Sequence, residues 1–299
     1  MSSENSSSEK LNWVEKQFRM KELGTNVKKE TLAGITTFVS MAYILFVNPS
    51  VLGASGMDKG AVFTATALSA ILGCLLMAFL ANYPIAIAPG LGDNAFFTYS
   101  VVLAMGIKWQ TALAGVVVAS IIFTILTFFK IREIVINAIP HNLKLAMAAG
   151  IGMFIAFIGL QGGGLVVASK SSLVQLGSLT VPTTWLTIFG LFVTALLMAR
   201  KVPGSIFIGI VATAILGLVT GLIKAPSQIV SSIPSMKPTF AVGIKHLGDV
   251  NTPQMWAVVL IFLLVAFFDT AGTLIGLAQQ AGLMKNDKMP RIGQALMAD

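Results

Sequence analysis

Runs of apolar residues alternate with short polar segments along almost the whole chain. Eight of these runs approach the ~20 residues that a helix needs to cross a bilayer. They fall near residues 31–52, 61–81, 84–105, 111–129, 144–160, 183–199, 204–222 and 254–283. The pattern predicts an all-α polytopic membrane protein with eight spans, followed in MPRIGQALMAD by the start of a ninth helix.

The third run is interrupted in its middle. In ANYPIAIAPGLGDNAFFTYSVVLAM, Pro84 and Pro89 flank the stretch Ile-Ala-Ile-Ala. Proline removes a backbone donor and disfavours helix at the residue before it. We therefore expect an extended stretch over 85–88 and a half-helix over 93–105 that begins near the bilayer midplane. Unpaired backbone at that depth is tolerated only against protein or a wet cavity, an arrangement typical of secondary transporters.

Asp93 and Asn94 stand at the expected start of this half-helix. Both residue types cap helices well, so one interpretation is capping of the first-turn N–H groups. The other is that one of them caps while its neighbour faces a substrate. Ser40, near the middle of the first span, is a weaker candidate, because hydroxyls on helices often bond the preceding turn.

Asp269 in FFDTAGTLIG follows a long uncharged stretch. A carboxylate in the middle of a span costs about 2.5–3.5 kcal/mol on insertion scales, so it must face protein or water, pair, or bind a proton. Thr273 lies one turn further on the same helix face. Asp269 is either a structural carboxylate bonded to another span or a group that binds substrate and proton.

Composition and charge agree with a membrane protein. The 299 residues are 56% hydrophobic and only 11% charged, against about 25% charged in soluble domains. The net charge of +8 does not indicate nucleic-acid binding, because the basic residues are spread between the apolar runs. Fourteen of the 20 fall on the side of the N-terminus, which predicts a cytoplasmic N-terminus. Cys74, the only cysteine, is expected to be a buried hydrophobe.

The sequence also predicts the structure of three segments outside the apolar runs. Residues 1–27 form a polar cytoplasmic tail, 132–144 a short interfacial helix, and 224–253 an ordered extracellular loop. The sequence contains no nucleophile–base pair and no metal-binding cluster, so we expect neither an enzyme nor a cofactor or metal site.

Three motifs resemble one family. YPIAIAPGLGDNAFFTYS, FFDTAGTLIG and MPRIGQALMAD are similar to segments of the AzgA-like hypoxanthine/guanine permeases, in the nucleobase–cation symporter group with the xanthine and uracil permeases. The resemblance implies fourteen spans in two inverted repeats of seven. Residues 28–130 and 254–299 would then belong to a core domain and 131–223 to a gate domain. It also implies a homodimer of the full-length form in the plasma membrane.

The resemblance also implies site residues. Asn94 matches the substrate-side residue after the break, Asp269 the carboxylate that binds the base ring, and Ser40 a contact from the first span. Many relatives have an apolar residue at Asp93 and a carboxylate at Ala266. The full set of candidates for substrate binding is Ser40, Asp93, Asn94, Phe96, Phe267, Asp269, Thr270 and Thr273. Asp93 and Asp269 are also the candidates for proton coupling.

These observations favour a proton symporter that imports hypoxanthine, guanine and possibly adenine. One alternative is an anion transporter of the sulfate or bicarbonate type with the same fold, because a half-helix N-terminus suits an anion. Asp93 and Asp269 argue against this alternative, because two carboxylates would repel an anion. A further alternative follows from the resemblance, in which the chain stops within the ninth element: a truncated chain that does not transport alone and has a structural role.

Overall fold

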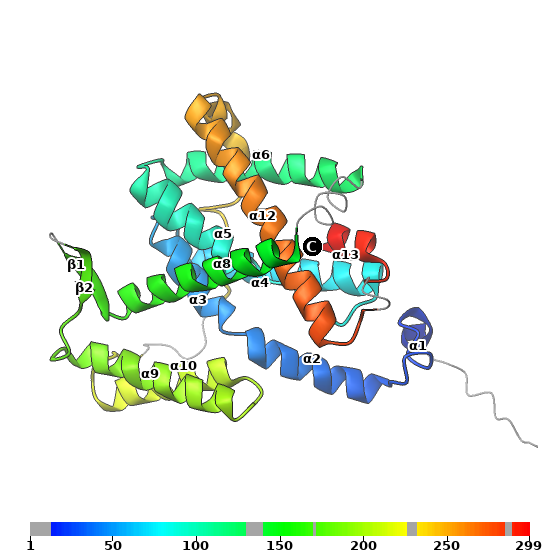
Figure 1. Cartoon of the computed structure of the whole chain (residues 1–299), viewed down its shortest axis with the longest axis horizontal. Coiled ribbons are helices and arrows are strands. Elements are labelled where there is room, and N and C mark those ends of the chain that lie inside the picture. The colour runs from blue at the N-terminus through cyan, green and yellow to red at the C-terminus, as the bar shows by residue number, and fades with distance from the viewer. Residues whose placement is uncertain (1–12, 130–139, 170–171, 226–231, 285–288) are drawn as a thin grey trace, which may run out of the picture.

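A computed structural model of the chain describes residues 13–129, 140–169, 172–225, 232–284 and 289–299. Helices make up most of these residues (Figure 1). The elements in chain order are α1 (Trp13–Gln17), α2 (Val27–Met41), α3 (Ile44–Gly53), α4 (Lys59–Leu76), η1 (Met77–Ala81), α5 (Leu91–Ala95), η2 (Phe96–Ala104), α6 (Trp109–Phe128), α8 (His141–Gly162), β1 (Val166–Ser169), β2 (Leu173–Leu176), α9 (Pro182–Ala199), α10 (Ser205–Val219), α11 (Val242–Lys245), η3 (Leu247–Val250), α12 (Pro253–Gln280) and α13 (Ile292–Ala298). η1 and η2 are π-helical, and η3 is a 3₁₀-helix.

The apolar runs are largely helical, as predicted, but not all eight form helices of spanning length. Within the described residues, five helical stretches are long and apolar enough to cross a membrane: Val27–Gly53, Lys59–Ala81, Trp109–Phe128, Pro182–Ala199 and Pro253–Thr270. Two further apolar helices, Gly152–Gly162 within α8 and α10, are shorter. The chain is therefore a mostly helical, polytopic membrane protein. The inverted-repeat arrangement stays a prediction.

The third run is broken, as predicted. η1 ends at Asn82, whose backbone is left-handed with φ 51°, and residues 82–90 form neither helix nor strand. The chain becomes helical again at Leu91 and continues through α5 and η2 to Ala104. The helix starts two residues earlier than expected, with Gly90 as its N-cap. Asp93 and Asn94 therefore lie inside its first turns, and the prediction that one of them caps the helix is wrong.

The main core lies where the ends of α3 and α4 meet η2, α6 and α12. Its buried side chains include Val62, Phe97, Val101, Val258 and Phe262. A second cluster joins η1 and the start of the break to the end of α12 and to α13, through Met77, Tyr83, Leu274 and Leu296. In Figure 1, α12 crosses the centre of the molecule beside α6, and α13 lies next to it. The two clusters hold both ends of the broken span.

An antiparallel hairpin between α8 and α9 departs from the predicted all-α fold. β1 and β2 pair with Val166 opposite Leu176 and Ser169 opposite Leu173. The strand sequences VVAS and LVQL are rich in β-branched and aliphatic residues, which favour strands. The hairpin was missed because each strand has only four residues, too few for a periodicity to stand out.

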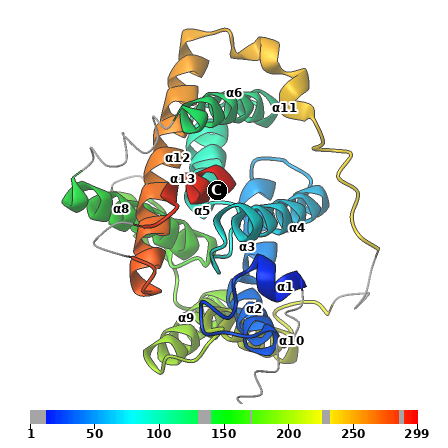
Figure 2. The ribbon, with the colours of Figure 1, turned by 90° about the vertical axis from the view of Figure 1, so that its right-hand side faces the viewer.

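α9 and α10 form an antiparallel pair that packs on α2 (Figure 2). Their contact is made by matched glycines and threonines. A Cβ on Gly190 would lie 2.5 Å from Oγ1 of Thr213, and Gly209 lies in the same way against Thr194. Small residues let the two backbones approach closely, as is typical of helices packed in membranes.

The described part of the N-terminal segment is folded against the end of the second apolar run. In the expected 1–27 tail, α1 is folded, and the Phe18 ring lies 5.6 Å from that of Phe79 in η1. The side-chain amide of Asn82 donates to the carbonyl of Phe18 at 3.4 Å. Residues 1–12 of the tail and most of the expected 132–144 helix lie outside the described residues.

The described part of the 224–253 loop is ordered against two helices. Thr64 on α4 donates to the carbonyl of Pro234 at 2.8 Å, and Thr111 on α6 donates to Asp249 at 3.2 Å. His246 Nδ1 lies 2.8 Å from the same carboxylate. This hydrogen bond with His246 lowers the pKa of Asp249, which is exposed and outside the spans.

Candidate functional site

Carboxylates gather at the point where the break becomes a helix. A Cβ on Gly90 would lie 2.8 Å from Oδ2 of Asp269 and 3.5 Å from Oδ2 of Asp93. Asp299, after α13, lies near enough for its charge to act on both. Only glycine allows the backbone to approach the two carboxylates this closely. The structure thus brings together Asp93 from α5 and Asp269 from α12, which the sequence proposed as one site.

One oxygen of Asp93 stands out within this group. Its Oδ1 is buried, and no hydrogen bond reaches it in the part of the chain that the structure describes. Buried polar atoms are nearly always hydrogen-bonded, so an unpartnered one calls for a ligand, a water or a proton.

Asn94, the next residue, belongs to a buried chain of polar groups. Its Nδ2 donates to Oδ1 of Asn48 on α3 at 2.6 Å. Nδ2 of Asn48 donates to Oγ1 of Thr66 on α4 at 2.8 Å, and Thr66 donates to the carbonyl of Val62 at 2.7 Å. Asn48 and Thr66 are each only 2% exposed. The chain joins α3, α4 and α5, and the side chains of Asn48 and Thr66, its two buried members, both have partners.

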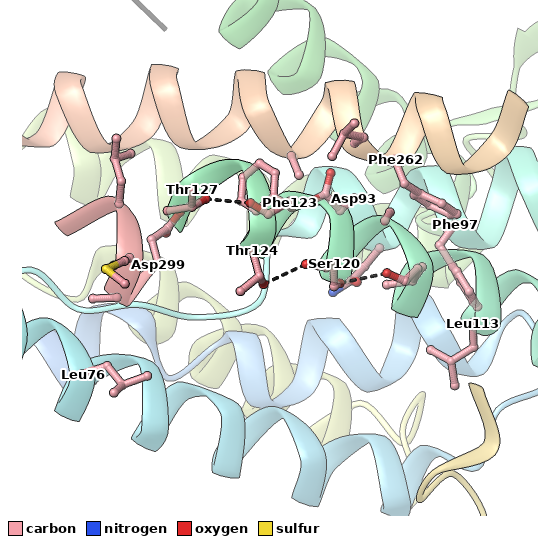
Figure 3. A pocket seen from close by; sticks show the side chains of 18 of the residues that line it. Leu76, Asp93, Phe97, Leu113, Ser120, Phe123, Thr124, Thr127, Phe262 and Asp299 are labelled. Atoms are coloured by element: carbon pink, nitrogen blue, oxygen red, sulfur yellow. Dashed lines mark hydrogen bonds between the residues drawn. The ribbon is translucent and has the colours of Figure 1, made fainter. Parts of the chain in front are cut away.

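A cavity of about 510 Å³ opens beside these groups (Figure 3). Asp93 and Asn94 line it from α5, and Ala266 lines it from α12. α6 contributes Ser120, Thr124 and Thr127, whose hydroxyls donate to carbonyls one turn earlier in their own helix. In Figure 3, Phe97 and Asp299 lie toward opposite ends of the space. Its size and mixed lining suit a small organic molecule.

The aromatic candidates are placed differently from the prediction. Phe96 packs edge-on against Phe262, with ring centroids 5.5 Å apart, and Phe267 packs in the same way against Phe123 at 5.0 Å. The rings that line the cavity are Phe97, Phe123, Phe128 and Phe262. Stacking of a ligand on Phe96 or Phe267 therefore stays a prediction, and Phe97 and Phe123 are better placed for it.

Three hydroxyl candidates have partners within the protein. Thr270 donates to the side chain of Asp299 at 2.7 Å. Thr273 donates to the carbonyl of Asp269 at 2.7 Å, and Ser40 donates to that of Thr36 at 2.9 Å. None of the three is among the residues that line the cavity. Of the predicted candidates, the structure therefore places Asp93 and Asn94 at the cavity and Asp269 next to Asp93.

Sequence reasoning missed Asn48, Thr66 and the polar face of α6. Asn48 stands in the first apolar run, 31–52, within the otherwise apolar stretch 44–49, and an amide at that place was the available signal. Ser120, Thr124 and Thr127 recur at spacings of four and three, which places them on one helix face. Nothing local in the sequence shows which neighbour that face meets.

A helical membrane protein whose broken span places a carboxylate and an amide at a cavity, with a second carboxylate beside them from another helix, has the layout of a membrane transporter. Comparison with known proteins agrees. The family model for xanthine and uracil permeases, described as the Permease family, matches residues 28–299. The chain belongs to this family.

Individual relatives are similar over nearly all of this chain. Identity is 53% over 291 residues with the guanine/hypoxanthine permease PbuG of Bacillus subtilis, covering 94% of this chain and 66% of PbuG. It is 49% with the putative permease MJ0326 of Methanocaldococcus jannaschii, covering 97% and 66%. It is 40% with the adenine permease AdeP of Escherichia coli, covering 96% and 64%. The chain thus spans about two thirds of the length of these relatives, and its resemblance to hypoxanthine/guanine permeases is confirmed.

Proposed function

We propose that this chain binds purine nucleobases at the cavity beside Asp93, Asn94 and Asp269 and takes part in their import by proton symport. The observation that carries the proposal is that Asp93, which lines the cavity beside the Asp269 carboxylate, has one buried oxygen without a hydrogen-bond partner among the described residues. The names of PbuG and AdeP point to the same ligands: guanine, hypoxanthine and adenine.

The chemistry of the groups suits a neutral base with N–H donors. Guanine and hypoxanthine present ring N–H groups beside carbonyl oxygens. Carboxylates accept from the N–H groups, and the Asn94 amide can pair with either kind of edge. A site built on such hydrogen bonds rejects analogues that lack them, often by several orders of magnitude.

Proton coupling is proposed from the same carboxylates. Ionised side chains in a membrane interior are costly, and those that persist there commonly relay protons. Asp93 and Asp269 lie on different helices and close together, so a proton taken up by one changes the charge that the other meets. The same charges oppose the alternative ligand, an inorganic anion, because two carboxylates would repel it.

The remaining parts of the proposal concern arrangement in the membrane. The distribution of lysines and arginines supports a cytoplasmic N-terminus, and the family resemblance supports a location in the plasma membrane. Residues 28–130 and 254–299 would form a core domain, residues 131–223 a gate domain and residues 224–253 an extracellular loop. The full-length form is proposed to be a homodimer.

The test combines binding and uptake. Binding of radiolabelled hypoxanthine is measured on the purified chain in nanodiscs. Uptake is measured in cells that lack purine permeases, with this chain and with a fusion in which the C-terminal third of PbuG follows Asp299. Asp269→Asn should lower binding and protonophore-sensitive uptake roughly 10- to 100-fold, the scale of one charged hydrogen bond. The control, Asp249→Asn, changes an exposed carboxylate that does not line the cavity and should transport normally.

Two results would contradict the proposal. If neither the chain nor the fusion binds or imports a purine, the ligand class is wrong. If purines are imported at the same rate by Asp269→Asn, with the same protonophore sensitivity, Asp269 is a structural carboxylate.

A further inference from the structure

In the buried chain of hydrogen bonds from Thr66 through Asn48 to Asn94, the geometry fixes which group donates and which accepts at each step. The assignment starts at Thr66. Oγ1 of Thr66 lies 2.7 Å from the carbonyl of Val62. A carbonyl oxygen only accepts, so the single hydroxyl hydrogen of Thr66 is directed to it. The Thr66 oxygen is then left as an acceptor, and it lies 2.8 Å from the Asn48 side chain.

This direction passes through Asn48 to Asn94. Because the Thr66 oxygen must accept, Asn48 turns its NH₂ group toward it and its Oδ1 away from it. Oδ1 of Asn48 in turn can only accept, and it does so from Nδ2 of Asn94 at 2.6 Å. The Asn94 amide is thereby held in one of its two orientations. Its own Oδ1 accepts no hydrogen bond within the described part of the chain.

We infer that Asn48 and Thr66 are positioning residues that hold the oxygen of the Asn94 amide as an acceptor toward the cavity. Asn94 lines that cavity next to Asp93, whose Oδ1 also lacks a donor. This corner of the site therefore consists of acceptors and selects ligands with N–H donors along the facing edge. The ligand class rests on the proposed function, whereas the geometry of the amide does not.

The network sits deep enough to hold its direction. Asn48 and Thr66 are 2% exposed, so water does not compete for their hydrogen bonds. Breaking one link leaves a buried polar group unpaired, which is costly in a medium of low dielectric. Flipping the Asn94 amide would set two NH₂ groups or two oxygens against each other along the chain.

Thr66→Val tests the inference, because valine has nearly the same shape and no hydroxyl. Without the hydroxyl, the amides of Asn48 and Asn94 can both turn over. We expect the preference for hypoxanthine over 1-methylhypoxanthine to fall about tenfold, the loss of one hydrogen bond. Thr66→Ser, which keeps the hydroxyl, should restore the preference. Thr64→Val is the matched control, since Thr64 is on the same helix but bonds the loop carbonyl of Pro234.

A second measurement needs no ligand. In protein labelled with ¹⁵N-asparagine, the Asn94 side-chain amide should exchange its hydrogen slowly in the unsubstituted protein and in Thr66→Ser. Exchange should be at least tenfold faster in Thr66→Val and Asn48→Ala, because protection follows the hydrogen bond.

The two measurements separate the possible failures. Unchanged exchange of the Asn94 amide in Thr66→Val and Asn48→Ala overturns the positioning role. The role is also overturned if Thr66→Val lowers thermal stability but leaves the ligand preference unchanged. If exchange responds as expected and no purine binds to any form, the amide geometry stands and only the proposed ligand is wrong.

Discussion

Gly90 shows how much of the candidate site depends on one residue without a side chain. It is the N-cap of α5, and the carboxylates of Asp93 and Asp269 both approach its Cα. Its backbone is not left-handed, with φ −64°, so any residue could adopt the conformation. What excludes a larger residue is the space that the Asp269 carboxylate already occupies.

Gly90→Ala should therefore disturb the site more than the fold. The added Cβ would lie 2.8 Å from Oδ2 of Asp269 and would push that carboxylate away. A displaced Asp269 carboxylate would lose its hydrogen bond to the ligand, so hypoxanthine affinity should fall by roughly tenfold or more. Gly34→Ala on α2, where no atom lies within 4 Å, is the control. If the two variants bind hypoxanthine with equal affinity, displacement of the Asp269 carboxylate does not weaken binding.

The broken span is the element that most distinguishes this fold. Its two prolines made the break predictable from sequence, because each removes a backbone donor and disfavours helix at the residue before it. How the break is supported was not predictable. Cys74 on α4, expected as a buried hydrophobe, is only partly buried, and its thiol meets both backbone groups of Ile87. Ile87 N–H donates to Sγ at 3.3 Å, and Sγ donates to the Ile87 carbonyl at 3.4 Å.

Cys74→Ala should thus destabilise the non-helical segment 82–90. Removing the thiol leaves the N–H and C=O of Ile87 unpaired, at a cost of about 1–3 kcal/mol. We expect a lower Tm in nanodiscs and weaker hypoxanthine binding, since the segment leads directly to Asp93. Cys74→Ser keeps a group that can donate and accept and should recover part of both losses. If alanine and serine have equal effects, the thiol supports the segment by its volume alone.

Across the whole molecule, the loop before α12 ties distant helices together. It bonds α4 through Thr64 and α6 through Thr111, and Gly243 of α11 packs closely on α6. In Figure 2, α11 lies beside α6 at the end of the molecule away from α9 and α10. The pair of His246 and Asp249 holds the final turn of this loop.

Because of the pair of His246 and Asp249, the stability of the loop should depend on pH. The pKa of Asp249 is lower in the folded protein than its unfolded value of about 3.9. Its stabilising effect is therefore present above pH 4 and is lost as pH falls through the folded pKa. We expect Asp249→Asn to lower Tm slightly at pH 6 and to match the unsubstituted protein near pH 2.5. A difference in Tm that is the same at both values would mean that the charge of Asp249 plays no part.

The sequence by itself determined that the chain is a mostly helical, polytopic membrane protein, that its third apolar run is broken, and to which family it belongs. These depend on local properties: the length of an apolar run, the missing donor of a proline, and motifs that keep their order along the chain. The candidates Asp93, Asn94 and Asp269 could be named for the same reason, since an unexplained polar group in a span is visible without any neighbour.

Only the tertiary structure decided what those groups meet. The rotation of each helix set the hydroxyl face of α6, rather than Thr273 or Ser40, against the cavity. Packing paired Phe96 with Phe262 and Phe267 with Phe123. It also placed Asn48 and Thr66 behind Asn94. Along the chain, Thr66 lies 18 positions from Asn48, and Asn94 lies 46 positions from it. Such contacts depend on how helices far apart in sequence pack, and no local pattern encodes that packing.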